Sequence, residues 1–181
     1  MYGNESRETM HTEVEEFLDL VDHQDRVIGK LERAQVYAQG FHNFRVINAF
    51  LINEQGQLWV PRRTAHKRLF PLHLDVSVGG HVSSGETYEE AFAREMQEEI
   101  GIALSDVCYK DLGLLTPHQH GVSAFMHVYT FFYEQVPPYN TNDISEYYWF
   151  YPHELMKKIT SASDKAKGDI PFLLNYFFEN R

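Results

Sequence analysis

The most constraining feature of this 181-residue sequence is the stretch GGHVSSGETYEEAFAREMQEEIGI, residues 79–102. Thr87 followed three residues later by Glu90 is the pattern of a capping box, and Gly101 is the residue type that commonly ends a helix. Apolar side chains recur between them at every fourth position, namely Tyr88, Phe92, Met96 and Ile100. This spacing predicts one well-capped amphipathic helix that packs its apolar stripe against a core and follows a glycine-containing loop.

The same helix carries three glutamates on one side. At about 100° per residue, Glu98 lies about 60° to one side of Glu95 and Glu99 lies about 40° to the other. Like charges at this spacing repel, whereas Mg²⁺ or Mn²⁺ would reverse the effect, because hard divalent cations take carboxylate oxygens and substrate phosphates as ligands. The glycines just before the helix let the backbone approach the same point, so a carbonyl near Gly79 could add an oxygen ligand. The structural alternative is an ordinary acidic helix face in solvent.

Strand and helix patterns surround this segment on both sides. Predicted strands and hairpins cover residues 17–31, 45–64, 72–80, 106–116, 122–134 and 147–151, and predicted helices cover 32–40, 153–159 and 171–180. Mixed strands and helices in one chain of this length indicate a single α/β domain with a central mixed sheet. We expect a loose leader at residues 1–13 and one domain at 14–181, with an N-terminal β-hairpin and a C-terminal helix.

Charge and cysteine content narrow the class of partner. The formal net charge of −10 argues against nucleic acid or an anionic membrane as the main partner, and no apolar run approaches the roughly 20 residues of a membrane span. The polar N-terminus lacks the apolar core of a signal peptide. A single cysteine, Cys108, excludes an internal disulfide and fits a reducing compartment, so we expect a cytoplasmic protein.

Residues of defined type stand at fixed intervals through the glutamate helix and its loop. With five, seven, one and one residues between successive groups, they are Gly80, Glu86, Arg94-Glu95-Met96, Glu98-Glu99 and Gly101-Ile102. This pattern resembles an unbroken Nudix box, and it spans 23 of the 181 residues. The resemblance implies a Nudix-type α/β/α sandwich that hydrolyses a nucleoside diphosphate linked to another moiety X, with magnesium or manganese as cofactor. Such metal ions can neutralise a diphosphate and activate a bound water.

The resemblance also implies roles for individual residues. Glu98 and Glu99 would be the main metal ligands, and Glu95 would be a further ligand or the base that activates water. The carbonyl of Gly79 would complete the metal shell, and Arg94 would orient a box carboxylate together with Glu86. Gly80, Glu86 and Gly101 would be structural members of the box.

A further carboxylate from a later loop assists many members of this family. Glu146, in the stretch NDISEYYWF, is the leading candidate, with a catalytic and a structural role equally open. Asp143 and Glu134 rank below it.

Basic residues before the box are candidates for binding the substrate. Arg62 and Arg63 alternate on a predicted strand, so we expect opposite directions, with one of them gripping a phosphate or with ordinary salt bridges as the alternative. Lys67 and Arg68 could reach the same site. His81 directly follows the glycine pair and is predicted to support the site. In TPHQHG (116–121), His118 and His120 could ligate a metal, but no third ligand of matching type is near in sequence, so the stretch is predicted to be a polar loop near the substrate mouth.

Two other functions are open. The sequence is similar to the Nudix branch that contains isopentenyl-diphosphate isomerase, but Gly79 stands where that enzyme has its catalytic cysteine, and the glutamates of its later strand are absent. A Nudix-fold module that binds a nucleotide without turnover is the other alternative, although such modules usually lose box carboxylates. A homodimer is expected from the aromatic residues near the C-terminus and from the habits of the family.

Overall fold

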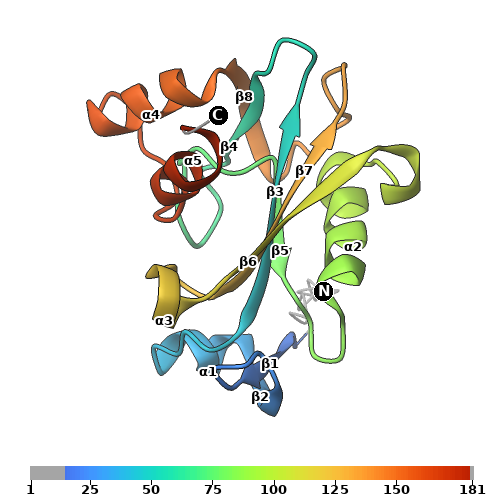
Figure 1. The fold of residues 1–181 in the computed structure, drawn as a ribbon, viewed down its shortest axis with the longest axis vertical. Coiled ribbons are helices and arrows are strands. Elements are labelled where there is room, and N and C mark those ends of the chain that lie inside the picture. Colours follow the sequence, from blue (N-terminus) through green and yellow to red (C-terminus); the bar gives the residue numbers. More distant parts are fainter. Residues whose placement is uncertain (1–14, 180–181) are drawn as a thin grey trace, which may run out of the picture.

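The computed structural model describes residues 15–179 and places a six-stranded mixed sheet at its centre (Figure 1). The strand order is β6-β7-β3-β4-β8, and β5 pairs separately with β3. The strands of this sheet are β3 (Arg45–Ile52), β4 (Leu58–Arg63), β5 (Val78–His81), β6 (Tyr109–Leu115), β7 (Phe125–Phe132) and β8 (Ile144–Phe150). The predicted α/β fold with a central mixed sheet is confirmed.

The pairing of the central strand β3 determines where its neighbours β4 and β5 separate. It runs parallel to β7 along its whole length and antiparallel to β5 through Val46–Ala49, whereas its only register pair with β4 is Ile52 with Leu58. The strands β4 and β5 therefore diverge from one another along β3. The described part of the chain contains no direct pairing of β4 with β5.

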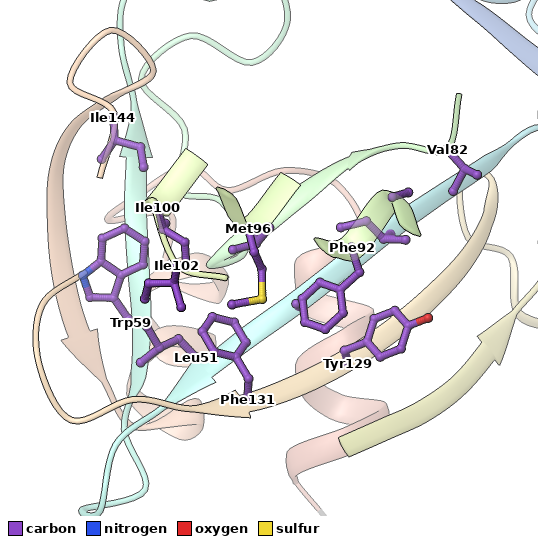
Figure 2. Close-up of a cluster of buried hydrophobic side chains, with 14 residues drawn as sticks. Leu51, Trp59, Val82, Phe92, Met96, Ile100, Ile102, Tyr129, Phe131 and Ile144 are labelled. Atoms are coloured by element: carbon purple, nitrogen blue, oxygen red, sulfur yellow. The ribbon is translucent and has the colours of Figure 1, made fainter. Parts of the chain in front are cut away.

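Helices cover both faces of the sheet. Figure 1 shows α2 (Tyr88–Ile100) on one side, and α4 (Pro152–Thr160) and α5 (Ile170–Phe178) on the other. In Figure 2, the buried side chains of α2 point toward the sheet, where Phe92 stacks on Tyr129 with ring centroids 4.5 Å apart. A second core cluster joins α4 and α5 to the opposite face.

The glutamate helix begins and ends where its sequence predicts. The Thr87 side chain accepts a hydrogen bond from the Glu90 backbone N–H, and the Glu90 carboxylate accepts one from the Thr87 backbone N–H, so the capping box is complete. Gly101 ends the helix with φ at 64°, in the left-handed region that favours glycine. Phe92, Met96 and Ile100 are fully buried.

The N-terminal part forms a separate two-stranded sheet. β1 (Phe17–Val21) and β2 (Val27–Glu32) pair antiparallel, and α1 (Arg33–Ala38) follows. The predicted hairpin and short helix are thus confirmed. The predicted leader, residues 1–13, lies outside the described residues, so the domain boundary at residue 14 stays a prediction.

Several predicted element boundaries were wrong, and the strands expected at 106–116 and 122–134 are shorter, at Tyr109–Leu115 and Phe125–Phe132. The strand expected at residues 72–80 begins only at Val78, because Leu74 bridges to both Arg62 and Ala166. The last strand begins at Ile144 rather than residue 147, because its partner β4 continues to Arg63. In place of the polar loop at 116–121 there is a short helix, α3 (Pro117–His120).

Within residues 15–179, no helix has the length and apolar character needed to cross a bilayer.

Candidate active site

Strand β5 and helix α2 bring the box glycines against two of the glutamates. The backbone N–H of Gly79 donates a hydrogen bond to Oε2 of Glu99 at 3.0 Å. A Cβ atom on Gly80 would overlap the carboxylate of Glu95. A Cβ on Gly79 would lie 2.8 Å from a methyl carbon of Val76. A side chain at either position would therefore force its neighbours to move, the Glu95 carboxylate among them, which favours glycines before this helix.

The direction of the Gly79 carbonyl follows from the ladder between β5 and β3. The N–H of Val82 donates to the carbonyl of Arg45, so these two residues form a hydrogen-bonded pair. Because such pairs alternate along an antiparallel ladder, the N–H and C=O groups of Gly79 and His81 point away from β3. Consistently, the Gly79 N–H reaches Glu99 and the His81 carbonyl accepts from Arg94. The Gly79 carbonyl thus points to the side of the strand where the glutamates lie.

Arg94 holds the loop and the helix together. Its guanidinium donates to both oxygens of Glu86, at 2.8 and 2.9 Å, and to Oε1 of Glu95 at 2.7 Å. These contacts, with the Glu86 bonds foremost, raise the pKa of Arg94 further above its ordinary value, while Arg94 lowers the pKa of Glu86. A two-point contact of this kind fixes geometry as well as charge. The structure therefore brings together Glu86, Arg94 and Glu95.

The three box glutamates differ in environment. Glu98 is exposed and lies 3.5 Å from Arg94, whereas the side chain of Glu95 is only 13% exposed. Burial raises the pKa of Glu95. Burial, followed by the nearby charges of Glu95 and Asp75, raises the pKa of Glu99 to about 8. Glu99 is therefore a partly buried carboxyl with too little positive charge around it to favour its ionised form.

The donor set of this region fits a hard divalent cation. Glu99 lines a cavity of about 20 Å³, which is room for one water-sized group. Carboxylate and carbonyl oxygens are the ligands that Mg²⁺ and Mn²⁺ prefer, and a cation would favour the ionised form of Glu99, whose pKa is raised by burial and then by the charges of Glu95 and Asp75. No three His, Cys, Asp or Glu side chains between residues 15 and 179 already form a metal cluster, so the glutamate side chains would have to turn toward a common point.

The other charged residues that line the same cavity form two ion pairs. Its lining includes Arg63, Lys67, Asp75 and Asp143 in addition to Glu99. Arg63 donates to Oδ2 of Asp75 at 2.7 Å, and Lys67 pairs with Asp143. The structure thus places Arg63, and not Arg62, beside a box glutamate.

Sequence reasoning missed Asp75 and Lys167. Oδ1 of Asp75 lies 3.0 Å from Nζ of Lys167, on the connection between α4 and α5. A charged residue within the apolar alternation LHLDVSVGG was a signal that could have drawn attention to Asp75. Lys167 lies more than sixty residues after the box, and no local pattern marks it.

Arg62 and Glu146 lie together on the opposite face of the sheet. Arg62 donates to Glu146 at 2.5 Å and to both oxygens of Asp164, at 2.8 and 2.7 Å. Tyr148 and Phe150, which follow Glu146 at the alternate positions of β8, pack with the core cluster of α4 and α5. The structure therefore does not bring Glu146 to the box glutamates, and of the later carboxylates Asp143 is the one beside Glu99.

The remaining candidates have local partners. Glu134 accepts a hydrogen bond from the Glu54 backbone in a distant turn. His81 hydrogen-bonds Tyr37 at 2.8 Å and stacks on Phe44, and burial lowers its pKa to about 3, so it is neutral near neutral pH. His118 stacks on His23, and His120 accepts from the Thr116 backbone.

Comparison with known proteins finds similarity to Nudix proteins over most of the chain. The model of the NUDIX domain matches residues 42–172. An uncharacterized Nudix hydrolase of Nostoc sp. is 50% identical over 165 residues, which cover 91% of this chain and 97% of that protein. A Nudix hydrolase of Deinococcus radiodurans is 46% identical over 160 residues, covering 88% and 92%.

A solved structure agrees with the fold in detail. The crystal structure of DR0079 from Deinococcus radiodurans is similar with a TM-score of 0.86 at 45% sequence identity, and the match covers 90% of this chain and 99% of that one. A shorter match, 36% identical over 92 residues, is to isopentenyl-diphosphate Delta-isomerase of Klebsiella pneumoniae. It covers about half of each protein, 51% and 50%.

Proposed function

We propose, from the premise that this chain belongs to the Nudix family and is a Nudix hydrolase, that it is a metal-dependent pyrophosphohydrolase. Its substrate would be a nucleoside diphosphate linked to a moiety X, and its cofactor magnesium or manganese. The family in general acts on small molecules that contain a diphosphate. The identity of X is open.

One observation carries the proposal. Glu99 is partly buried against the glycine strand, with Glu95 and Glu98 on the same side of α2, and the pKa of Glu99 is raised to about 8. A purely structural surface helix would leave these carboxylates in water, where they cost little. A cluster in which two of three carboxylates are partly buried and under-neutralised, next to an oriented backbone carbonyl, is what a divalent cation would stabilise.

Each residue then has a task. Glu98, Glu99 and the Gly79 carbonyl would hold the cation, which when bound supplies charge neutralisation and a water of lowered pKa. Glu95 would either join the ligands or accept the proton of the attacking water. Arg94 holds Glu95 in place and ties it to Glu86.

Other residues would bind the substrate. Arg63, beside Glu99 in the cavity lining, is our candidate for gripping a phosphate. We give Arg62 and Glu146 a structural role, because they pair with one another and with Asp164 on the opposite face. His81 supports the site by packing, as a neutral ring. The homodimer and the cytoplasmic location remain predictions from the sequence.

A hydrolysis screen tests the proposal. It would offer nucleoside di- and triphosphates, dinucleoside polyphosphates, nucleotide sugars, NADH, coenzyme A and isopentenyl diphosphate with magnesium and then with manganese. We expect turnover of at least one substrate, and a loss of about a hundredfold or more in Glu99→Gln. Glu89→Gln is the matched control, because it removes an exposed carboxylate from the first turn of the same helix.

The other functions have their own outcomes in this screen. Binding without turnover in the wild-type protein would support the nucleotide-binding module instead. Proton exchange into isopentenyl diphosphate without hydrolysis would support an isomerase, and equal loss in Glu89→Gln and Glu99→Gln would contradict the assigned site.

A further inference from the structure

The connection between α4 and α5, residues 161–169, reaches the active site through Lys167, whose Nζ lies 3.0 Å from Oδ1 of the cavity residue Asp75. Ala166 bridges to Leu74 in parallel. The N–H of Leu74 donates to the carbonyl of Lys165 at 2.8 Å, and the N–H of Lys167 donates to the carbonyl of Leu74 at 3.0 Å. The backbone on both sides of Ala166 is therefore fixed to the segment that leads into β5.

A buried ion pair fixes the same connection from the other face. Arg62 donates to both carboxylate oxygens of Asp164, and the two side chains are only 15% and 17% exposed. This two-point contact lies three residues before Lys167. The position of the Lys167 side chain is thus determined by the sheet and not by a freely moving loop.

Lys167 and Arg63 share one carboxylate. Asp75 accepts from Arg63 through Oδ2 at 2.7 Å, and its Oδ1 lies 3.0 Å from Nζ of Lys167. The same Oδ1 also accepts the N–H of Val76 at 2.8 Å, so Asp75 keeps its place independently of the lysine. Two cations on one anion leave a net charge of about +1 in this triad.

The triad lies next to the glutamates of α2. Asp75 and Arg63 line the same small cavity as Glu99, and the charges of Asp75 and Lys167 both act on the pKa of Glu99, in opposite directions. Lysine has three N–H donors, and Asp75 takes one of them. The side chain of Lys167 is 29% exposed, which leaves donors for a ligand.

We propose that Lys167 binds a phosphate oxygen of the substrate's diphosphate, with Arg63 beside it and Asp75 positioning both cations. This assignment rests on the proposed function and names a binding residue that belongs to the C-terminal part of the chain. A diphosphate held between this triad and a cation on the α2 glutamates would have its negative charge neutralised from both sides.

The alternative is that Lys167 only neutralises Asp75. In that case its removal would lower stability without weakening the binding of a diphosphate. The two roles are separable by measuring binding of magnesium imidodiphosphate, a diphosphate analogue that resists hydrolysis, by calorimetry in folded variants.

The test uses Lys167→Gln, Lys167→Arg and the matched control Lys165→Gln, which changes an exposed lysine two residues away in the same connection. We expect Lys167→Gln to weaken imidodiphosphate binding about tenfold or more, and to raise KM by a similar factor with kcat changed less than about threefold. Lys167→Arg keeps the charge and should recover much of the affinity, whereas Lys165→Gln should match the wild type.

Wild-type affinity in Lys167→Gln would overturn the proposal, and so would a wild-type protein that does not bind imidodiphosphate at all. Failure of the hydrolysis proposal looks different. A wild-type protein that binds imidodiphosphate but hydrolyses no substrate contradicts turnover, while the affinity ratio of Lys167→Gln to Lys165→Gln still decides the role of Lys167. Thermal melting of each variant shows whether it still folds. If Lys167→Gln does not fold, the affinity of Lys167→Arg for imidodiphosphate is compared with the wild type instead.

Discussion

Two charged clusters lie on opposite faces of the sheet, and they differ in how well their charges balance. Around Arg62, one guanidinium that is nearly buried contacts Asp164 at two points and Glu146 at a third. Around α2, a single guanidinium, Arg94, contacts Glu86 and Glu95 closely, and Glu98 at 3.5 Å, while Glu99 receives only a backbone N–H. Both clusters hold more carboxylates than guanidiniums, two to one around Arg62 and four to one around α2, but Arg62 contacts both of its carboxylates, whereas Arg94 contacts only Glu86, Glu95 and Glu98 among those described.

The difference separates a structural ion-pair group from a candidate binding site. When the charged side chains of a cluster are paired with one another, few of their donors and acceptors are free to bind a ligand. A cluster with buried, under-neutralised carboxylates gains free energy when a cation arrives. The neighbours Arg62 and Arg63 show the same contrast on a smaller scale, because Arg62 is surrounded by protein partners and Arg63 lies at the cavity beside Glu99.

Among substitutions outside the proposed metal ligands, the largest effect in the α2 cluster should come from Gly80→Ala. The new methyl would overlap the Glu95 carboxylate, which Arg94 holds at 2.7 Å, so the carboxylate has to move. A displacement of about 1 Å in an active site can cost on the order of a hundredfold in rate, so we expect kcat to fall by about that factor. The melting temperature should change little, because the far end of a flexible side chain can give way. Gly29→Ala is the control, since a Cβ there meets no atom within 4 Å. Unchanged kcat in Gly80→Ala would mean that the position of Glu95 is unimportant.

On the opposite face, Arg62→Met should act mainly on stability. Removing the guanidinium leaves Asp164 unpaired at 17% exposure, and we expect the free energy of unfolding to fall by roughly 2–3 kcal/mol in urea denaturation. Arg26→Met provides the comparison, because Arg26 is 73% exposed and its pair with Asp22 should contribute little to stability. A large rise in KM with unchanged stability would instead restore Arg62 as a substrate-binding residue.

The third effect is a pH dependence of the stability of the metal-free protein. The pKa of Glu99 is raised from 4.5 to about 8, so between these values the folded protein keeps a proton that the unfolded chain has lost. Stability from this group is complete below about pH 4.5 and is lost as the pH rises through about 8. In the presence of a chelator, we expect the free energy of unfolding of the wild type to fall by roughly 2 kcal/mol between about pH 5 and pH 7, relative to that of Glu99→Gln. Parallel stability curves for the two proteins would contradict the burial of an uncompensated carboxyl at Glu99.

Short sequence patterns correctly predicted the features of α2 that depend only on neighbouring residues. The capping box at Thr87, the left-handed Gly101 and the apolar stripe of α2 are set by neighbours within one or two helical turns, and all three were predicted correctly. Boundaries that depend on distant partners were missed. Leu74 lies outside β5 because it forms β-bridges with Arg62 and Ala166, and neither residue is close to it in the chain.

The sequence by itself determined the mixed α/β fold, the glutamate helix and the spacing of its acidic residues, because helix geometry converts spacing directly into a shared side. It also placed Arg62 and Arg63 on opposite sides of one strand, since side chains alternate along a strand. Only the tertiary structure decided which arginine meets the glutamates, that Glu146 lies on the far face, and that Asp75 joins Lys167 to the site. These choices depend on strand register and on contacts across roughly a hundred residues, which no local pattern encodes.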